Sequence, residues 1–598
     1  MQIRQIYKLL SSLLNINYFV QQSFIFIKLF LFSGIYTLSN KMSEFNGTLQ
    51  PNGESKNVKQ REMIKVDEMP PITIAILFGF QQVMVCVSAL LTIPFILTDS
   101  LCPGDKLNEV RVKLISATFV TSGISTIIQS AFGFRLALLQ GVAFAYVPTI
   151  EAYFKGDRIC HLTINDHVEE DVINEKMAYI LGSLMISSMI PFIIGLTGMV
   201  GKITKYIGPL TIASIMLCLV ISSVNMTVNR MEKHWVAIVQ AGALFITILY
   251  LSNFNIKLPT YKDGRIQMAK TNIFSHYPYL IAIIVAWITC ILLTVTDLVP
   301  PESEARTDKN SSIAVIVKSP WVRIPYPGMY GPPKFDVALI LGFVVSAMTS
   351  VFESIGDYHA AARVSEERAP PSHAINRGIM AEACGSFLSS LLGPGAGITT
   401  HTENIGVMGV TRVASRYVMC FAGFLLIILG IFTKVGAVLS TIPDPLVGGV
   451  LASSMAMVAG VAISNLQQVD MQLSRNMTIL GFSIMTGLAL PEYFRRHRIN
   501  TNHDVANQVL QVLLTLEMFI GGLTACILDN TVPGASREQR GLRERGLIHD
   551  LGETNRDVYY WPKWAMKILD RFPILKNIPF IPKEKILKNN HVSDISKI

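Results

Sequence analysis

Charged residues are scarce in this chain of 598 residues: Asp, Glu, Lys and Arg make up 16% of it, whereas hydrophobic residues make up 51%. An average soluble domain has about 25% charged residues. A chain with so few charges cannot keep this much apolar surface away from water by itself. The composition therefore excludes an ordinary soluble protein and predicts a protein solvated largely by lipid.

Motifs for enzymatic chemistry are missing as well. The sequence contains no metal-ligand spacing, nucleophile elbow, phosphate-binding loop or arrangement of Ser, His and Asp in its predicted loops. We therefore predict that the protein is not an enzyme and has no metal site or cofactor.

The net charge of +9 has two possible explanations. Basic residues on one face, interleaved with aromatic residues, would indicate a nucleic-acid partner. Here the basic residues lie in loops and at the chain ends, for example Lys56, Lys59 and Arg61, which is the pattern of positive residues on the cytosolic side of a membrane protein. We predict no nucleic-acid partner and place both termini in the cytosol.

Only eight cysteines are present, and most lie inside apolar segments, where a thiol is a small apolar side chain. Cys102 and Cys160 fall in loops that we place outside the cell. There, both a disulfide between them and two free thiols are open alternatives. Asn225 and Asn310 begin glycosylation sequons in loops that we also place outside.

Long apolar runs are what the chain has in abundance. About 20 helical residues cross the roughly 30 Å hydrocarbon core of a bilayer, and runs of this kind recur along the chain. We predict an all-α polytopic membrane protein with about fourteen transmembrane segments. These are residues 72–97, 113–132, 136–154, 177–199, 208–224, 234–251, 277–296, 334–352, 376–392, 401–411, 416–441, 446–464, 477–491 and 508–528.

A polar loop at residues 297–333 divides these segments into seven and seven. Because seven is odd, two similar halves enter the membrane in opposite orientations, as in the inverted repeats of secondary transporters. The predicted parts are a largely disordered cytosolic extension (1–71), a first repeat (72–296), the extracellular loop (297–333), a second repeat (334–528) and a cytosolic tail (529–598). The sequence leaves open whether residues 1–41 belong to the mature protein.

The third and tenth segments are interrupted in matching places of the two halves. The third contains Gly141 and Pro148, and the tenth follows the Gly-rich run LLGPGAG at 391–397. In lipid, backbone can leave helical geometry only where its N–H and C=O groups face protein, water or ligand. We therefore predict short strands in these two segments and, near residue 404, the start of a half-helix. Two interrupted segments in matching positions of the two halves predict a binding site at the membrane midplane.

Three carboxylates lie in or beside these apolar segments. Glu403 follows the Gly-rich run, whereas Glu353 and Asp357 are four residues apart and therefore share one helical face. Carboxylates inside a membrane are costly and are usually functional. We predict that all three share one cavity. The alternative is that each pairs with an Arg from a loop or caps a helix.

Four other residues are candidates for the same site. Phe144 suits stacking on a flat ligand, with ordinary packing as the alternative. Gln81 and Gln82, in the middle of the first segment, suit hydrogen bonds between helices, with ligand contact as the alternative. His401 lies on the same side of an extended strand as Glu403 and is either a proton relay or a neutral, hydrogen-bonded side chain.

Three stretches of the second half carry a distinctive pattern: ESIGDYHAAARV at 353–364, HAINRGIMAE at 373–382 and ENIGVMGVTRVASR at 403–416. They resemble the nucleobase–ascorbate transporters, the nucleobase:cation symporter-2 family that includes solute carrier family 23. The family signature is matched by Glu403, Asn404, Gly406, Thr411 and Arg412. Shorter matches extend the resemblance over about residues 72–545.

The resemblance implies fourteen spans in two inverted repeats, a core domain that carries the substrate, a gate domain that forms a homodimer, and elevator-like movement of the core. Spans 1–4 and 8–11 belong to the core in that plan, and spans 5–7 and 12–14 to the gate. By the same likeness, Glu353 and Glu403 hydrogen-bond the substrate and Phe144 stacks on it. Asn404 and Asp357 support the site or the coupling ion, which is Na⁺ or H⁺.

The chain also departs from the family pattern. Gln82 stands where His is usual after Gln81, Ala396 where Asn is common, and Ala143 where Ser precedes the stacking Phe. The first change bears on the bracing of the core, and the other two remove polar groups near the cavity. We count Ala143 and Thr402 among the predicted substrate contacts.

Charge helps to predict the substrate. Relatives similar to ascorbate carriers have Pro in place of Glu403, and a second carboxylate at a few ångströms repels the ascorbate anion unless a cation neutralises it. A neutral purine or pyrimidine instead offers N–H donors to both carboxylates, at about 1.5–3 kcal/mol for each charge-assisted bond. We therefore expect a plasma-membrane symporter for xanthine, urate or uracil. Sodium-dependent ascorbate transport, and a channel or uncoupled anion pathway on the same fold, are the alternatives.

Overall fold

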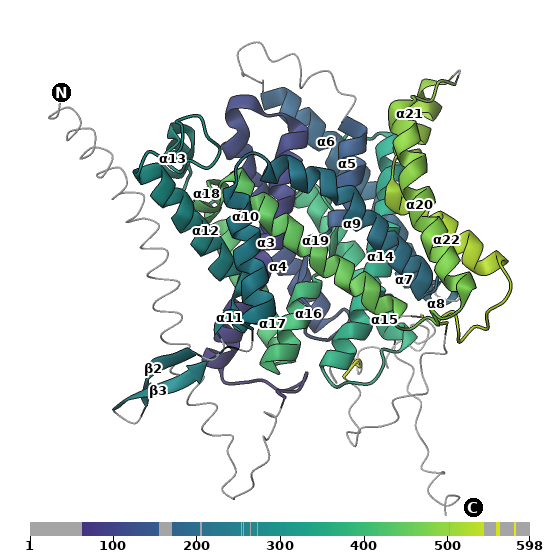
Figure 1. Ribbon diagram of the computed structural model, residues 1–598, viewed down its shortest axis with the longest axis horizontal. Helices are drawn as coiled ribbons and strands as arrows, with labels where there is room; N and C mark the ends of the chain where they lie inside the picture. The colour runs from purple at the N-terminus through teal and green to yellow at the C-terminus, as the bar shows by residue number, and fades with distance from the viewer. Residues whose placement is uncertain are drawn as a thin grey trace, which may run out of the picture.

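The computed structural model describes residues 63–154, 170–203, 206–252, 254, 256–262, 265–271, 273–501, 503–542, 558–561, 579 and 581. The described chain is mostly helical (Figure 1). Eight of its helices are long and apolar enough to cross a membrane, or up to ten if each of two bent pairs forms one span. The chain is thus a polytopic membrane protein, and the count of fourteen spans stays a prediction.

Each predicted segment coincides with a helix, a broken pair of helices, or a strand followed by a helix. The first half contains α3 (Ile72–Leu101), η2 (Gly104–Lys106), α4 (Leu107–Ala131), β1 (Gln140–Val142), η3 (Phe144–Tyr146), α5 (Val147–Phe154), α6 (Glu170–Ser187), α7 (Met189–Thr197), α8 (Val200–Ile203), α9 (Pro209–Met231), α10 (Val236–Phe245), the π-helical turn η6 (Ile246–Tyr250), β2 (Ile256–Lys262), β3 (Arg265–Thr271), α11 (Ile273–His276) and α12 (Pro278–Val295).

The polar loop between the halves contains one short helix, α13 (Asn310–Lys318). The second half contains α14 (Val337–Val364), α15 (Ser372–Leu392), β4 (Ile398–Thr400), α16 (Thr402–Thr411), α17 (Arg416–Ile431), α18 (Thr433–Ser440), α19 (Asp444–Leu466), α20 (Ser474–Arg496), α21 (Asp504–Leu514) and α22 (Glu517–Thr531).

Local sequence explains where several helices begin and end. The Asp336 side chain caps α14 by accepting hydrogen bonds from the backbone N–H groups of Ala338 and Leu339. Helices α9, α12 and α19 have Pro in their first turn, where the missing N–H would be unpaired in any case. Helix α15 ends at Gly393, whose φ of 96° is in the left-handed region that glycine adopts without strain.

The helices pack in two groups. The first bundle consists of α3–α7 and α14–α18, which pack mainly with one another; its tightest pair is α4 and α17. There Gly123 is essential, because a Cβ at this position would lie 2.5 Å from the backbone oxygen of Gly423. The second bundle consists of α9, α10, α12, α19, α20 and α22, while α21 packs across onto α14.

A small antiparallel sheet lies inside the first bundle. Strands β1 and β4 pair with Gln140 opposite Thr400 and Val142 opposite Ile398, and all of their residues are buried. Strand β1 leads into η3 and α5, and β4 leads into α16. The short strands and the half-helix expected in the interrupted segments are therefore present, and α16 begins at Thr402, close to the predicted residue 404.

The hairpin of β2 and β3 differs from the expectation of a basic loop between two membrane segments. The two strands pair along their whole length, from Ile256 opposite Thr271 to Lys262 opposite Arg265. The alternation of apolar and polar residues is too irregular here to predict a strand from sequence.

The predicted modification sites have mixed outcomes. Cys102 is disulfide-bonded, so the alternative of a free thiol there is wrong, and its candidate partner Cys160 lies outside the described residues. The loop placement of Asn225 is wrong, because α9 continues past the apolar run to Met231 and includes Asn225. Asn310 is exposed at the first residue of α13, and its glycosylation stays a prediction.

Candidate functional site

The candidate site is built where α16 begins against α14 and α3. The Thr402 hydroxyl donates to both carboxylate oxygens of Asp357 on α14, at 3.0 Å each. The side-chain amide of Asn404 donates to the side-chain oxygen of Gln82 on α3 at 2.8 Å and to its backbone oxygen at 2.9 Å. Asp357, Asn404 and Gln82 therefore hold the first turn of the half-helix in place, as a brace between helices predicts.

Glu403 lies in that first turn, next to the positive end of the half-helix. Its carboxylate is 3.6 Å from Nδ1 of His401, and both side chains are nearly buried. Among the described residues, no Arg or Lys forms an ion pair with Glu403, Glu353 or Asp357. The alternative that each carboxylate pairs with an Arg from a loop is therefore not observed there.

The three predicted carboxylates lie near one another. Glu353 on α14 interacts electrostatically with Glu403 and Asp357, since all three are close and share one sign of charge. Asp357 is fully buried, whereas Glu353 is only partly buried. A set of like charges in low dielectric is stable only with a compensating cation or proton, or with hydrogen-bond donors from a ligand.

The second interrupted segment contributes Ala143 and Phe144. Ala143 is buried, and its N–H donates to the backbone oxygen of Gly397 at 2.7 Å. Phe144 follows at the start of η3 with part of its ring accessible. Because β1 and β4 are antiparallel, Phe144 and Thr402 leave the sheet at opposite ends. The structure thus brings both broken segments into the first bundle, and the roles of Phe144, Ala143 and Thr402 in substrate contact stay predictions.

Three further predicted residues have structural settings that differ from one another. His401 packs against Gly141 of β1. Gln81 is buried on α3, beside the Gln82 brace. Within the signature, Arg412 pairs with Glu366 at 2.6 Å beyond the end of α16, so it caps this turn and lies away from the carboxylates.

A fourth carboxylate, Glu382 on α15, was missed by the sequence analysis. It is buried and accepts hydrogen bonds from Ser354 at 2.6 Å, Thr400 at 2.7 Å and Tyr358 at 2.8 Å. Gln140 of β1 joins the same network by donating to Thr400 at 2.8 Å. The rule that an intramembrane carboxylate is functional, which identified Glu403, applies equally to Glu382 and would have found it.

A close approach of β1 to α16 makes Gly141 a sensitive position. A Cβ there would lie 2.0 Å from Nε2 of His401 and 2.6 Å from Cδ2 of Leu90. Overpacking costs about 1–3 kcal/mol, and about 1.4 kcal/mol in a barrier is tenfold in rate. We expect Gly141→Ala to lower initial uptake per surface molecule about tenfold, because it displaces His401 from Glu403.

The matched control is Gly460→Ala in α19, where a Cβ would meet nothing within 4 Å. Surface biotinylation gives the number of molecules in each sample. Wild-type uptake by both variants would show that the position of His401 does not matter to the site.

A large cavity of about 1220 Å³ lies between the two bundles. Its walls come from the ends of α3, α5 and α6 and from α9, α21 and α22, with Glu151 and Asn225 among the lining residues. None of the predicted substrate contacts lines it in the described chain. It is therefore a vestibule at the end of the bundles where α3 finishes.

Ion pairs cross between the bundles beside this vestibule. In the first bundle, Asp99 of α3 and Arg111 of α4 interact, at 3.3 Å. In the second, Asp444 of α19 lies 2.9 Å from Lys233 and 3.8 Å from Arg230. Two pairs cross the boundary: Arg111 with Asp444 at 3.0 Å, and Arg230 with Asp99. Each bundle thus supplies both an Asp and an Arg, so each keeps an internal pair if the crossing pairs separate.

A buried polar site between two broken segments, inside a bundle of membrane helices, is the arrangement of a secondary transporter. Residues 73–496 match the Xan_ur_permease family model, described as "Permease family". The chain is 37% identical to "Solute carrier family 23 member 1" of Mus musculus over 544 residues, which cover 87% of this chain and 88% of the relative. It is 28% identical to "Nucleobase-ascorbate transporter 1" of Arabidopsis thaliana over 494 residues, covering 81% and 90%.

The chain belongs to this permease family, that of the nucleobase–ascorbate transporters and solute carrier family 23, as the signature at Glu403 predicted. Its relatives are named as transporters, so it is a membrane transporter and not an enzyme. Among solved structures, the murine anion transporter Slc26a9 in its inward-facing state is 11% identical with a TM-score of 0.40, covering 82% of this chain and 74% of that one.

Proposed function

We propose that this protein is a secondary active symporter that imports a neutral nucleobase such as xanthine, urate or uracil together with Na⁺ or H⁺. The observation that supports this most is the group of Glu353, Asp357 and Glu403 at the start of the half-helix. Two carboxylates that face one ligand accept N–H groups of a neutral base, each bond being worth about 1.5–3 kcal/mol. The same carboxylates repel an anion.

Coupling to a cation follows from the same charges. Asp357 accepts a hydrogen bond from the Thr402 hydroxyl, and the oxygen atoms of both side chains are ligands of the kind that Na⁺ prefers. A buried carboxylate such as that of Asp357 can also carry a proton. Either ion reduces the repulsion among the carboxylates when it binds. In this proposal, the ion and the base therefore bind together more tightly than either binds alone.

Movement of the first bundle against the second completes the proposal. The grouping of the helices supports it, because α3–α7 and α14–α18 pack mainly with one another and contain the whole candidate site. The crossing ion pairs of Asp99 and Asp444 have internal alternatives in both bundles, so they can open without leaving a buried charge alone. The repeats at 72–296 and 334–528, a homodimer, a plasma-membrane location and cytosolic termini belong to the same proposal.

Ascorbate is the second candidate substrate, and one contact favours it. His401 lies 3.6 Å from Glu403 and, when protonated, offsets one carboxylate. An anion then meets less repulsion. The names of the plant relatives include both nucleobase and ascorbate, so they do not separate these candidates.

Glu403→Pro tests which class of substrate the site selects. Pro is tolerated here because residue 403 is in the first turn of α16, where a missing N–H breaks no helical hydrogen bond. We expect the wild type to take up radiolabelled xanthine or uracil and not ascorbate. Glu403→Pro should lower base uptake about tenfold or more, since one charge-assisted bond is lost, and should gain ascorbate uptake.

Glu304→Gln is the control, because this exposed loop carboxylate pairs only with Lys309 in the described structure and lies outside the bundles. Uptake of ascorbate alone by the wild type would refute the nucleobase assignment. Equal uptake of the base by the wild type and Glu403→Pro would refute the role of Glu403.

A further inference from the structure

Two described stretches of the chain after α22 dock on the protein in separate places, and Pro579, further along, lies beside Gly198 at the end of α7. We name residues 536–542 the proximal anchor and residues 558–561 the distal anchor. The proximal anchor contacts only the second bundle in the described structure, and the distal anchor contacts the first bundle. Residues 543–557, fifteen in number, connect the two anchors along the chain.

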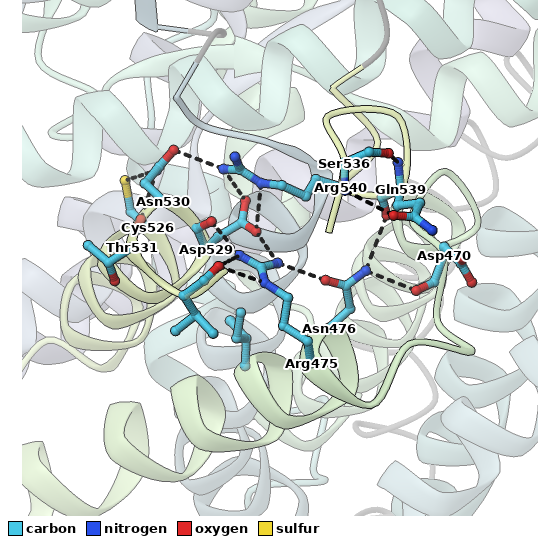
Figure 2. Close-up of polar contacts among 12 residues, drawn as sticks. Asp470, Arg475, Asn476, Cys526, Asp529, Asn530, Thr531, Ser536, Gln539 and Arg540 are labelled. Atoms are coloured by element: carbon cyan, nitrogen blue, oxygen red, sulfur yellow. Dashed lines mark hydrogen bonds and ion pairs between the residues drawn. The ribbon is translucent and has the colours of Figure 1, made fainter. Parts of the chain in front are cut away.

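The proximal anchor is held by a buried carboxylate (Figure 2). Asp529, near the end of α22, is contacted by Arg475 of α20 at 2.9 Å and by Arg540 of the anchor at 3.0 and 3.1 Å. Asn476 of α20 donates to the backbone oxygen of Gln539 at 3.2 Å. Because the carboxylate of Asp529 is fully buried and doubly paired, removing either arginine would leave part of a buried charge unpaired.

The distal anchor is received by buried arginines of the first bundle. Arg377 of α15 donates to the backbone oxygen of Tyr559 at 2.7 Å, and Arg416 of α17 donates to that of Val558 at 3.2 Å. Both arginine side chains are nearly inaccessible. They therefore bind the main chain of the anchor, which forms a turn and a bend at residues 558–560.

Aromatic side chains fill the same surface. Tyr559 is fully buried, its ring centroid lies 5.5 Å from that of Phe134, and its hydroxyl donates to the backbone oxygen of Arg368 at 2.8 Å. The indole N–H of Trp561 donates to the backbone oxygen of Phe132 at 3.0 Å. A buried aromatic ring with a satisfied polar group is the usual anchor of a specific interface.

We infer that the surface formed by the end of α4 and the starts of α15 and α17 is a docking site for this chain's own distal anchor, and that the tail is a strap between the two bundles. This inference rests on the proposed movement of one bundle against the other. With both anchors docked, the chain between them ties the second bundle to the first and disfavours arrangements in which the bundles have moved beyond its reach. Fifteen connecting residues reach at most about 54 Å when fully extended, which limits the displacement that leaves both anchors docked.

A disulfide cross-link tests the docking without any transport assay. The ring centroids of His373 and Tyr560 lie 5.8 Å apart, so we expect a short bis-methanethiosulfonate reagent to join His373→Cys and Tyr560→Cys through a disulfide at each end when the other free cysteines are replaced by Ala. A protease site inserted between residues 543 and 557 reports it, because the cleaved tail then stays attached until the disulfide is reduced. Adding Tyr559→Ala/Trp561→Ala should abolish the cross-link. Release of the tail without reduction in the parent variant would overturn the docking site.

Uptake kinetics test the strap. Relative to the wild type, we expect Tyr559→Ala/Trp561→Ala to raise the maximal uptake rate per surface molecule at least twofold with little change in KM. Inserting fifteen Gly and Ser residues after position 550, which keeps both anchors, should have the same effect. Removal of residues 582–598, which follow both anchors, is the control and should change nothing.

A lost cross-link with an unchanged or lowered maximal rate in both the double variant and the insertion would overturn the strap. The two proposals fail separately. If the wild type concentrates neither a nucleobase nor ascorbate, the proposed function is wrong, whereas the cross-link still reports on the docking site.

Discussion

Glu353→Gln should lower nucleobase uptake about 10- to 100-fold at equal surface expression. The amide keeps the shape of the carboxylate but loses the charge-assisted bond, worth about 1.5–3 kcal/mol, and about 1.4 kcal/mol corresponds to a factor of ten. It also removes one negative charge from the group with Glu403 and Asp357, which weakens attraction for the coupling ion. The measurement is the initial rate of radiolabelled xanthine uptake, with and without sodium and at two external pH values.

Combination with Glu403→Gln sharpens this test. If the two carboxylates bind one ligand, the double variant loses less than the product of the single losses, because either change alone already breaks the shared site. Fully multiplicative losses would place them in independent sites. Wild-type rate and KM in Glu353→Gln would remove this residue from the substrate site.

Asp444→Asn should cause the largest loss of stability. Asp444 is nearly buried and faces Arg111, Arg230 and Lys233, so its neutralisation leaves three cations with one carboxylate, that of Asp99. Breaking a buried pair from one side costs about 3–5 kcal/mol. We expect a clear drop in the midpoint of thermal denaturation of the purified protein in detergent.

Asp308→Asn is the matched control for this loss. Asp308 lies in the polar loop at residues 297–333 and pairs with Arg306 at 2.8 Å while remaining 41% exposed, so its contribution is about 1 kcal/mol or less. The Arg306 guanidinium donates hydrogen bonds that hold the pKa of Asp308 below its usual value. This small contribution is therefore present above the ordinary aspartate pKa and is lost as pH falls through the lowered one.

A second change separates charge from packing at Asp444. Adding Lys233→Met to Asp444→Asn removes one of the three unpaired cations, so part of the lost stability should return. Equal denaturation midpoints of Asp444→Asn and Asp308→Asn would contradict a stabilising role of the crossing ion pairs.

The parts of the fold that follow from local physics were predictable. Apolar run length identified the helices, because lipid requires about 20 helical residues for each crossing. The Gly and Pro residues of the third and tenth segments identified the strands, because an uninterrupted helix does not favour LLGPGAG. Apolar run length did not predict the end of a helix that continues through polar residues. Helix α9 continues to Met231, so Asn225 lies in the helix and not in a loop.

Contacts between distant segments were harder to predict. The spacing of Glu353 and Asp357 predicted that they lie on one helical face, and the family signature predicted that Glu403 lies near them. Periodicity alone does not predict which distant segments of the chain are in contact. The sequence did not predict that Asp99 and Asp444 bind the same arginines, Arg111 and Arg230. These side chains meet only because α4 packs against α18 and α9 packs against α19. Glu382 differs from these residues, because it lies inside the apolar segment 376–392 and the cost of an intramembrane carboxylate identifies it from sequence alone.

The most direct test of the central claim is an experimental structure of the protein with xanthine bound. The account predicts that the base lies between Glu353 and Glu403, with its N–H groups donating to both carboxylates and its ring against Phe144. Density for xanthine elsewhere, for example in the vestibule beside Glu151 with both carboxylates free of ligand, would contradict it.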